Sequence, residues 1–316
     1  TNLHVVFGAS GGIGNALVRE LHRQGKPVRG VNRNGKADVP KDVEIVAADA
    51  RRLEQALSAS EGAVVIYNCV FPPTQAALIR AAEQTGAKLV LADNLYMYDP
   101  SKGALKETSP TVHDGRQQAK QRIDMAETLL SAHKNGRIRA TIGRASDFFG
   151  PNALNGILGP RLFEAALAGK AASTIGDPDL PHTYTFVNDF ARALIILAED
   201  TKADGAIWHV PSAKTVTTRE FYEMVFATAG NKPKMMAAGR FLMTLIGLFD
   251  STMRELKREK LYQFEMPFVV DHQKFSTHFP FKVTSHQEAI RQTISWYAQR
   301  TNQNDTYAIS EAATIM

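Results

Sequence analysis

The chain has 316 residues, 44% of them hydrophobic, which is enough to bury a large core in one domain or two. Its formal net charge of +5 at neutral pH suits acidic ligands such as phosphates. The basic residues are spread along the chain and form no block, so we expect no nucleic-acid partner.

Short runs rich in β-branched residues alternate with amphipathic segments through the first half of the chain. The spacing predicts strands over residues 3–7, 27–31, 43–47, 63–68, 88–92 and 138–142. It predicts helices over residues 13–24, 74–84 and 117–133. Alternation of this kind is typical of βαβ units that are wound into a parallel sheet.

A glycine-rich turn joins the first predicted strand to the first predicted helix. Gly8 allows a tight turn, Gly11 lets the backbone approach a pyrophosphate, and Gly14 lets the helix pack on the strand. The helix N-terminus then faces the phosphates. We predict that the pyrophosphate is held by Gly8, Ser10, Gly11, Gly12, Ile13 and Gly14. A plain connecting loop is the alternative, but the flanking strand and helix favour an α/β Rossmann fold, a doubly wound parallel sheet.

The residues at the end of the second predicted strand decide how the adenosine ribose of a dinucleotide is bound. An acidic side chain there hydrogen-bonds the ribose hydroxyls of NAD and repels a 2′-phosphate. This chain has Asn32 followed by Arg33 instead. A guanidinium can hold a phosphate through two hydrogen bonds, so we predict NADP as the cofactor, with NAD as the alternative. The preference disappears if Arg33 is only a solvated surface residue.

The regular alternation ends after Pro151. Residues 183–187 and 207–210 resemble further strands, whereas 217–229 and 240–260 have a helical pattern. We predict an NAD(P)-binding Rossmann domain over residues 1–150, with returning strands near 183–213 and 266–274. A smaller, mostly helical C-terminal substrate lobe then comprises residues 151–182, 214–265 and 275–300, followed by a polar tail over 301–316. We interpret 240–260 as an apolar lid with a solvated basic end; a basic helix that touches a membrane is the alternative.

Several motifs beyond the glycine turn have a distinctive sequence and spacing. They are Asp49 at the end of the third strand, Arg144 with Phe149-Gly150-Pro151, and the stretches 186–193, 270–274 and 294–297. Together with the GxxGxxG spacing, they resemble the extended branch of the short-chain dehydrogenase/reductase superfamily, the NAD(P)-dependent epimerase/dehydratase group. The resemblance covers nearly the whole chain.

The resemblance implies further cofactor contacts. In this group the residue at the position of Asp49 meets the adenine, and residues at the end of the fourth strand line the cofactor. The residues that this adds are Asp49, Ala50, Asn68, Cys69 and Val70. The group includes epimerases, dehydratases, reductases and non-catalytic binders, so the resemblance does not choose among these functions.

Most of the catalytic residues that are usual in the epimerase/dehydratase group are missing from this sequence. Its members use a Ser or Thr to hold the substrate oxygen, a Tyr to pass the proton, and a Lys one helical turn later to lower the pKa of the Tyr. Counted back from Tyr98, the Ser position is Asn94, whose amide can hydrogen-bond a carbonyl but cannot relay a proton. The Tyr and Lys positions are Ala119 and Ile123; in a second register Lys120 takes the Lys position, but Arg116 then takes the Tyr position. Neither register restores the tyrosine, so the chain resembles an atypical member with a degenerate tetrad.

Other side chains nearby are candidates to replace the missing pair. Lys120 and Arg122 lie within one helical turn of the expected lysine, and a loop above the fifth strand carries two tyrosines. The catalytic residues that we predict are Asn94, Tyr98, Lys120 and Arg122, with Tyr96 and His113 next in order. The alternative for each is a solvated helix charge or a packed loop tyrosine.

The sequence thus predicts an NAD(P)-dependent oxidoreductase or epimerase that acts on a carbonyl or hydroxyl of a small organic or nucleotide-sugar-like substrate. The alternative is a non-catalytic NADP(H)-binding redox sensor or regulator, which the missing tyrosine favours. The nine histidines show no paired metal spacing, so we expect no metal site. Related proteins often dimerise through the helix that matches 117–133, and we expect a homodimer there.

The location of the protein follows from three observations. The single cysteine, Cys69, lies in an apolar run and is interpreted as a buried structural thiol, which suits a reducing cytoplasm. A strand begins at residue 3, which leaves no room for a signal peptide. The longest apolar stretch, 241–249, is too short to span a membrane. We therefore expect a cytoplasmic protein with no membrane span.

Overall fold

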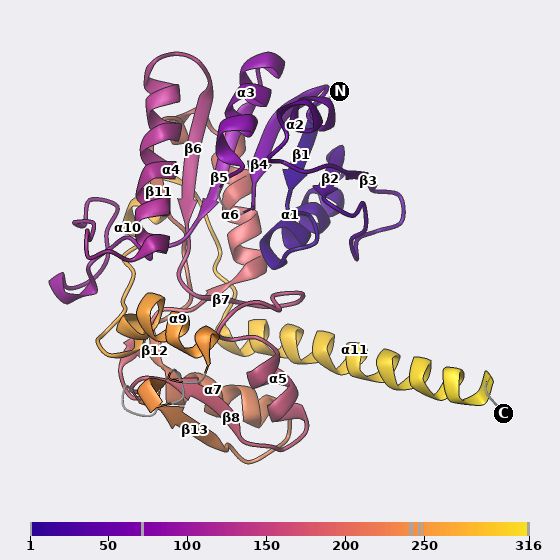
Figure 1. Ribbon diagram of the computed structural model, residues 1–316, viewed down its shortest axis with the longest axis vertical. Helices are drawn as coiled ribbons and strands as arrows, with labels where there is room; N and C mark the ends of the chain where they lie inside the picture. The colour runs from indigo at the N-terminus through magenta and orange to yellow at the C-terminus, as the bar shows by residue number, and fades with distance from the viewer. Residues whose placement is uncertain (1, 71–72, 240–242, 246–247, 249, 315–316) are drawn as a thin grey trace.

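The computed structural model describes residues 2–70, 73–239, 243–245, 248 and 250–314 (Figure 1). The predicted lid over 240–260 therefore lies partly outside the described residues. Within it, α9 covers Ser251–Glu259, and the 3-10 helix η3 follows at Leu261–Phe264. None of the helices in the described part of the chain has both the length and the apolar character needed to cross a bilayer.

A seven-stranded sheet is the centre of the fold, and its strands all run parallel. In chain order the strands are β1 (Leu3–Phe7), β2 (Val28–Asn32), β3 (Glu44–Ala47), β4 (Ala63–Asn68), β5 (Lys88–Asp93), β6 (Arg139–Arg144) and β11 (Ile207–His209). Their spatial order is β11-β6-β5-β4-β1-β2-β3. The chain thus reverses its direction of progress between β1 and β4, as in a doubly wound sheet. The predicted fold class is confirmed.

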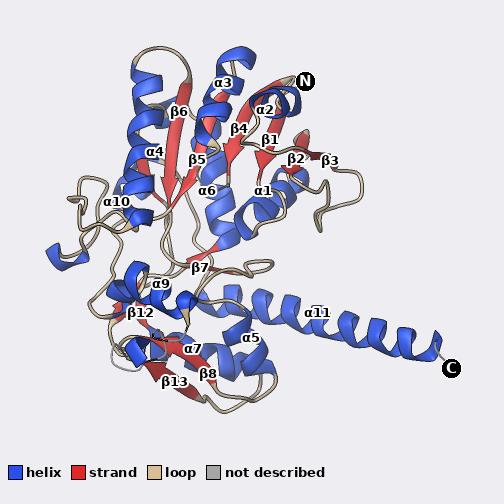
Figure 2. Ribbon diagram, viewed as in Figure 1, coloured by secondary structure: helices blue, strands red, loops and turns tan. Residues whose placement is uncertain are grey.

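Helices cover both faces of this sheet (Figure 2). On one face lie α1 (Gly12–Arg23) and α6 (Val187–Glu199), with Leu17 and Phe190 fully buried against β1 and β5. On the other lie α2 (Leu53–Ala59), α3 (Gln75–Thr85) and α4 (Gln117–Lys134), with Leu78 and Leu129 buried. The sequence analysis missed α2 and α6. Both faces of each central strand are therefore apolar, which is why β4 and β5 read as continuous hydrophobic runs.

A smaller lobe lies beyond the carboxyl ends of the strands (Figure 1). Its helices are α5 (Pro160–Leu167), α7 (Thr218–Thr228) and α11 (His286–Thr314), and its strands pair as β8 (Ala172–Ile175) with β13 (Met235–Ala238) and β9 (Pro181–His182) with β12 (Val216–Thr217). Its core is aromatic: Phe149, Phe163, Phe221 and Tyr297 are buried together. Three short helices complete the chain: η1 (Pro100–Lys102), η2 (Thr201–Ala203) and α10 (Gln273–His278).

Two predicted returning strands do not join the central sheet. Within 183–187 only β10 (Thr185–Phe186) forms, and it pairs in parallel with β7 (Phe148–Phe149), because Val187 already begins α6. Residues 266–274 make only isolated bridges, Phe268 to His182 and Val270 to Leu105, before α10 begins. The strand predicted over 207–210 does join, as β11. The predicted polar tail continues α11 as far as Thr314.

A buried lysine ties the amino end of the sheet to the helical layer. Lys88 begins β5, and its side chain is only 1% exposed. Its Nζ donates hydrogen bonds to the carbonyl oxygens of Leu197 (2.5 Å) and Asp200 (3.0 Å), and it is paired with Asp204 at 2.5 Å. Asp204 is also paired with Arg139 at 2.8 Å, so Lys88 contributes both a buried donor to the two carbonyls and one of the two cations beside Asp204.

We predict that Lys88→Ala lowers the free energy of unfolding by about 3 kcal/mol, because it removes a buried donor to two carbonyl oxygens and one of the two ion-pair partners of Asp204. Urea denaturation measures the loss. Lys170→Ala, at an exposed position, is the matched control and is expected to stay within about 0.5 kcal/mol of wild type. Equal stability of the two variants would contradict the prediction.

Candidate dinucleotide site

The glycine turn brings three chain segments into close contact. Gly8 has φ of +93°, and a Cβ added there would stand 2.7 Å from the carbonyl oxygen of Cys69. A Cβ on Gly14 would stand 2.1 Å from the carbonyl oxygen of Gly8. No side chain fits at either position. The two glycines therefore hold the start of α1 against the ends of β1 and β4, at the point where the sheet order reverses.

The N-terminus of α1 has the features of an anion site. Gly11 is its N-cap and no side chain caps the helix. Helical hydrogen bonding begins with the Asn15 N–H, which donates to the Gly11 carbonyl at 2.8 Å. In the described chain, no backbone carbonyl accepts a hydrogen bond from the N–H of Gly12 or Ile13. These donors and the helix dipole fit a pyrophosphate.

Gly11 differs from its neighbours because it faces open space. It is exposed, and a Cβ there would meet only the Gly8 carbonyl, at 3.4 Å. The loop after β7 covers the adjacent side: a Cβ on Gly12 would be 2.9 Å from the Cα of Ala153, and Asn152 Nδ2 donates to the Ser10 carbonyl at 3.1 Å. The sequence analysis missed Asn152 and Ala153, for which only their place after the Gly150-Pro151 motif was a signal.

The predicted adenosine contacts lie at the ends of β2 and β3. Asn32 is buried, and its amide group bonds both the carbonyl and the N–H of Lys36, so it shapes the turn. Arg33 is exposed. Asp49 is paired with Arg51, and hydrogen bonds from Arg51, with the added charge of Arg33, hold the pKa of the Asp49 carboxyl well below its usual range.

The predicted contacts at the end of β4 flank the glycine turn. Asn68 is buried, donates to Gln75 Oε1 at 3.2 Å and accepts from the Val70 N–H at 3.2 Å. The Cys69 N–H donates to the Phe7 carbonyl at 3.0 Å. Burial raises the pKa of the Cys69 thiol, in keeping with a structural role. Ala50, which follows Asp49, is buried in the core between the sheet and α2.

Tyr98 lies in a buried polar network and not in an open site. It is 1% exposed, and its hydroxyl accepts a hydrogen bond from Arg144 Nη1 at 2.6 Å. Burial lowers the pKa of His209 to about 4, so its ring is neutral, and because Nδ1 faces the Asp271 carbonyl at 3.1 Å, Nε2 is the acceptor. The Tyr98 hydroxyl lies 3.3 Å from that nitrogen and 3.4 Å from the Glu107 carbonyl, and either can accept its proton. Its hydrogen bonds are therefore made within the protein.

The remaining predicted catalytic residues have different surroundings. Arg122 is buried and pairs with Asp93 at 3.4 Å, next to the bond of 2.8 Å from Arg144 to the same carboxylate. Lys120 is 71% exposed and pairs with Asp124 on the outside of α4. Asn94 is half-buried, and its Oδ1 accepts from the Tyr96 N–H at 3.1 Å. The structure thus places Asn94, Tyr96, Tyr98 and Arg122 around the end of β5, leaves Lys120 and His113 exposed, and keeps Ala119 and Ile123 buried.

Two groups at the same edge were not expected from the sequence. His182 Nε2 is 3.0 Å from Asp147 Oδ2, and both side chains are buried. Lys260, predicted to lie in a solvated basic end, is half-buried with its Nζ 3.2 Å from the ring centre of Tyr96. It enters from the lobe, more than 160 residues away in sequence, which no local pattern reveals. Among the described residues, no cluster of three or more His, Cys, Asp or Glu side chains is arranged to hold a metal ion.

Comparison with known proteins gives one family and many similar folds. The model of the NAD dependent epimerase/dehydratase family matches residues 4–210. The chain is 23% identical over 318 residues to the Arabidopsis thaliana 3beta-hydroxysteroid-dehydrogenase/decarboxylase isoform 2, covering 87% of this chain and 56% of that protein. The chain thus spans just over half of that relative's length.

Three solved structures illustrate the similarity of fold. A Thermus thermophilus UDP-glucose 4-epimerase in complex with NAD has a TM-score of 0.76 and 20% identity over 94% of this chain and 99% of that chain. An epimerase from Methanothermobacter thermautotrophicus has a TM-score of 0.81 and 14% identity over 96% of this chain and 94% of that chain. A Bacillus anthracis dTDP-glucose 4,6-dehydratase in complex with NAD has a TM-score of 0.76 and 14% identity over 95% of this chain and 97% of that chain.

The family match covers the central sheet from the second residue of β1 to the end of β11, and includes the glycine turn. The solved structures show the same arrangement of sheet and lobe over nearly the whole chain. The resemblance inferred from the motifs is therefore confirmed. This chain belongs to the NAD dependent epimerase/dehydratase family.

Proposed function

We propose that the protein is an NADP(H)-dependent oxidoreductase or epimerase that acts on a carbonyl or hydroxyl of a small substrate of the nucleotide-sugar type. The observation that carries this proposal is the uncapped N-terminus of α1, held by Gly8 and Gly14 at the point where the sheet order reverses. The names of two similar structures, a UDP-glucose epimerase and a dTDP-glucose dehydratase, support the substrate class. The Arabidopsis relative is named for a hydroxysteroid, an alternative of different size and polarity.

The chain would hold the cofactor along the carboxyl edge of the sheet. Backbone N–H groups of Gly12 and Ile13 would bind the pyrophosphate, and Arg33 the 2′-phosphate. Asp49, Asn68, Cys69 and Val70 would line the adenine and the middle of the molecule, with Asn94 nearest the reacting carbon. When bound, a nicotinamide cofactor supplies hydride transfer. The lobe beyond residue 150 would cover the substrate, and α4 would form the interface of a homodimer.

Asn94 is the residue best suited to hold the substrate oxygen. Its Oδ1 is occupied by the Tyr96 N–H, which orients the amide and leaves its Nδ2 as the donor. In contrast, the buried hydrogen bonds of Tyr98 and the exposed ion pair of Lys120 favour structural roles for these two residues. A non-catalytic NADP(H) sensor is the second candidate, because the buried Ala119 and Ile123 occupy the positions of the usual Tyr and Lys.

We predict that Gly11→Val abolishes dinucleotide binding, with at least a 100-fold loss of affinity, because its side chain would fill the space in front of the α1 N-terminus. Titration calorimetry with NADP and NAD measures the affinity. Gly11 has φ of −81°, so the folded backbone accepts a side chain there. Gly14→Val is the contrasting variant: it should lower the melting temperature, because its Cβ would overlap the Gly8 carbonyl. Wild-type affinity in Gly11→Val would refute the site.

The choice of NADP over NAD is tested at Arg33. Arg33→Ala should weaken NADP binding by tenfold or more, since a charged hydrogen bond contributes about 1.5–3 kcal/mol, and should leave NAD binding within about twofold. Arg23→Ala, at the opposite end of α1, is the control and should change neither affinity. Equal affinities of the wild type for the two cofactors would exclude the NADP preference and leave the dinucleotide site itself intact.

A further inference from the structure

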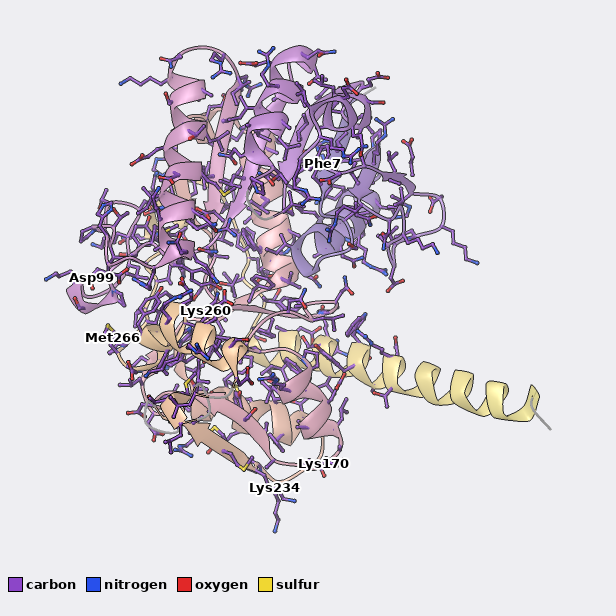
Figure 3. All side chains as sticks on the ribbon, viewed as in Figure 1. Phe7, Asp99, Lys170, Lys234, Lys260 and Met266 are labelled. Carbon is purple, nitrogen blue, oxygen red and sulfur yellow. The ribbon has the colours of Figure 1, made fainter. Side chains whose placement is uncertain are left out.

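A lysine and two tyrosines contact one another near the carboxyl end of β5. The lysine and one tyrosine come from the lobe, and the other tyrosine comes from the Rossmann half. Lys260 follows α9, Tyr262 lies in η3, and Tyr96 lies in the loop after β5. Lys260 Nζ is 3.2 Å from the centre of the Tyr96 ring, and the Tyr262 hydroxyl donates to the Tyr96 carbonyl at 3.2 Å. Figure 3 labels Lys260 at the junction between the carboxyl edge of the sheet and the lobe.

The segment that carries Lys260 is anchored on both sides. Glu259 is 2% exposed and accepts hydrogen bonds from the N–H groups of Gln117 and Gln118, at 3.4 and 3.2 Å, in the first turn of α4. On the other side, Leu261 and Phe264 are buried in a small apolar cluster. Because the α4 N-terminus favours the Glu259 carboxylate, the anchor holds the next residue, Lys260, close to the start of α4.

Tyr262 completes this arrangement. The Arg116 guanidinium, at the start of α4, lies 3.6 Å from the centre of the Tyr262 ring, and the Tyr262 hydroxyl bonds the Tyr96 backbone. Tyr96 in turn donates its N–H to Asn94 Oδ1 at 3.1 Å. A continuous series of contacts therefore joins Lys260 to Asn94, the residue proposed to hold the substrate oxygen.

The surroundings of Lys260 favour proton exchange near neutral pH. Burial lowers the pKa of Lys260 to about 8; Asp147, between β6 and β7, and Glu259 act against this shift, while Arg122 of α4 adds to it. The face of the Tyr96 ring also favours the ammonium form. The contact that places Nζ is the one with the face of the Tyr96 ring.

We propose that Lys260 is the catalytic residue that exchanges the proton of the substrate oxygen, in place of the Tyr and Lys of the helix. This inference rests on the proposed function. In the oxidative direction the substrate O–H bond breaks, its proton passes to the neutral Nζ amine, and its electron pair forms the second bond of the carbonyl. The hydrogen of the adjacent C–H bond leaves with its two electrons to the oxidised dinucleotide. In the reductive direction the Lys260 ammonium returns the proton to the oxygen.

The position of Lys260 can be tested without a substrate. The full chain is labelled with acetic anhydride across a pH range, with and without saturating NADP, and the labelled lysines are quantified by mass spectrometry. We expect a labelling midpoint near pH 8 for Lys260, below the value of about 10.4 that is usual for a lysine side chain in a peptide. NADP should slow labelling of Lys260 at least fivefold and leave Lys170 unchanged. An ordinary midpoint, or no protection by bound NADP, would overturn the proposal.

The role of Lys260 in proton transfer is tested by kinetics with NADPH and 4-nitrobenzaldehyde as the probe. Lys260→Met should lower kcat about 100-fold, with KM and NADPH affinity within about threefold of wild type. Lys260→Arg should lose a similar factor, because it keeps the charge but cannot release the proton. Lys257→Met is the control on α9, where Lys257 donates to Thr244 Oγ1 away from Tyr96.

The pH profile separates proton transfer from a structural role. A reductive rate that needs the ammonium falls as pH rises through about 8, and this decline should be absent in Lys260→Arg. Wild-type kcat and an unchanged pH profile in Lys260→Arg would overturn the role of Lys260 alone. Failure of the wild type to bind any dinucleotide by calorimetry would contradict the proposed function instead.

Discussion

All seven strands of the central sheet run parallel, so the loop after each strand emerges at the same edge. Backbone groups of the loops at that edge lack hydrogen-bond partners within the sheet. β1 and β4 are neighbours, but the chain continues from β1 toward β2 and from β4 toward β5, so the loops after these two strands run in opposite directions. Gly8 and Gly14 make the closest contact there: any side chain at either position would overlap a carbonyl oxygen. The exposed N-terminus of α1, and hence the candidate dinucleotide site, depends on this one close approach of helix and strand.

The same edge must also accommodate buried charge. Asp93 at the end of β5 is paired with Arg144 at the end of β6 and with Arg122 of α4, and the hydroxyl of Tyr98 lies between Arg144 and His209. Buried charges persist only when they are paired and hydrogen-bonded. This network therefore pairs the polar groups of Tyr98 and Arg122 within the protein, at the carboxyl ends of β5 and β6.

Loss of the usual Tyr and Lys from α4 is accompanied by a different use of its N-terminus. Glu259 occupies the first-turn N–H groups of that helix, and the chain next to it places Lys260 on Tyr96 and Tyr262 against Arg116. The lobe thus supplies a phenol and an ammonium to the loop after β5, where both contact Tyr96. In this arrangement the distance between Lys260, the proposed proton-exchanging group, and the end of β5 depends on how the lobe packs on the sheet. It does not depend on the positions of residues along α4.

Features that depend on residues near one another in the chain could be predicted from the amino-acid sequence. Alternating apolar runs specified six strands and the parallel sheet, and the spacing of Gly8, Gly11 and Gly14 specified the strand-turn-helix unit, because these patterns express local geometry. Residues whose position depends on contacts between distant segments show no such local pattern. Thr185 and Phe186 were predicted to join the central sheet but pair with β7 instead, and Lys260 was predicted to be a solvated charge but contacts Tyr96. The enclosure of Tyr98 by Arg144 and His209 depends on how β6 and β11 stand beside β5 in the sheet, and the contact of Lys260 with Tyr96 depends on the packing of the lobe on the sheet. Hydrophobic periodicity encodes neither arrangement, because both join segments that are distant in the chain.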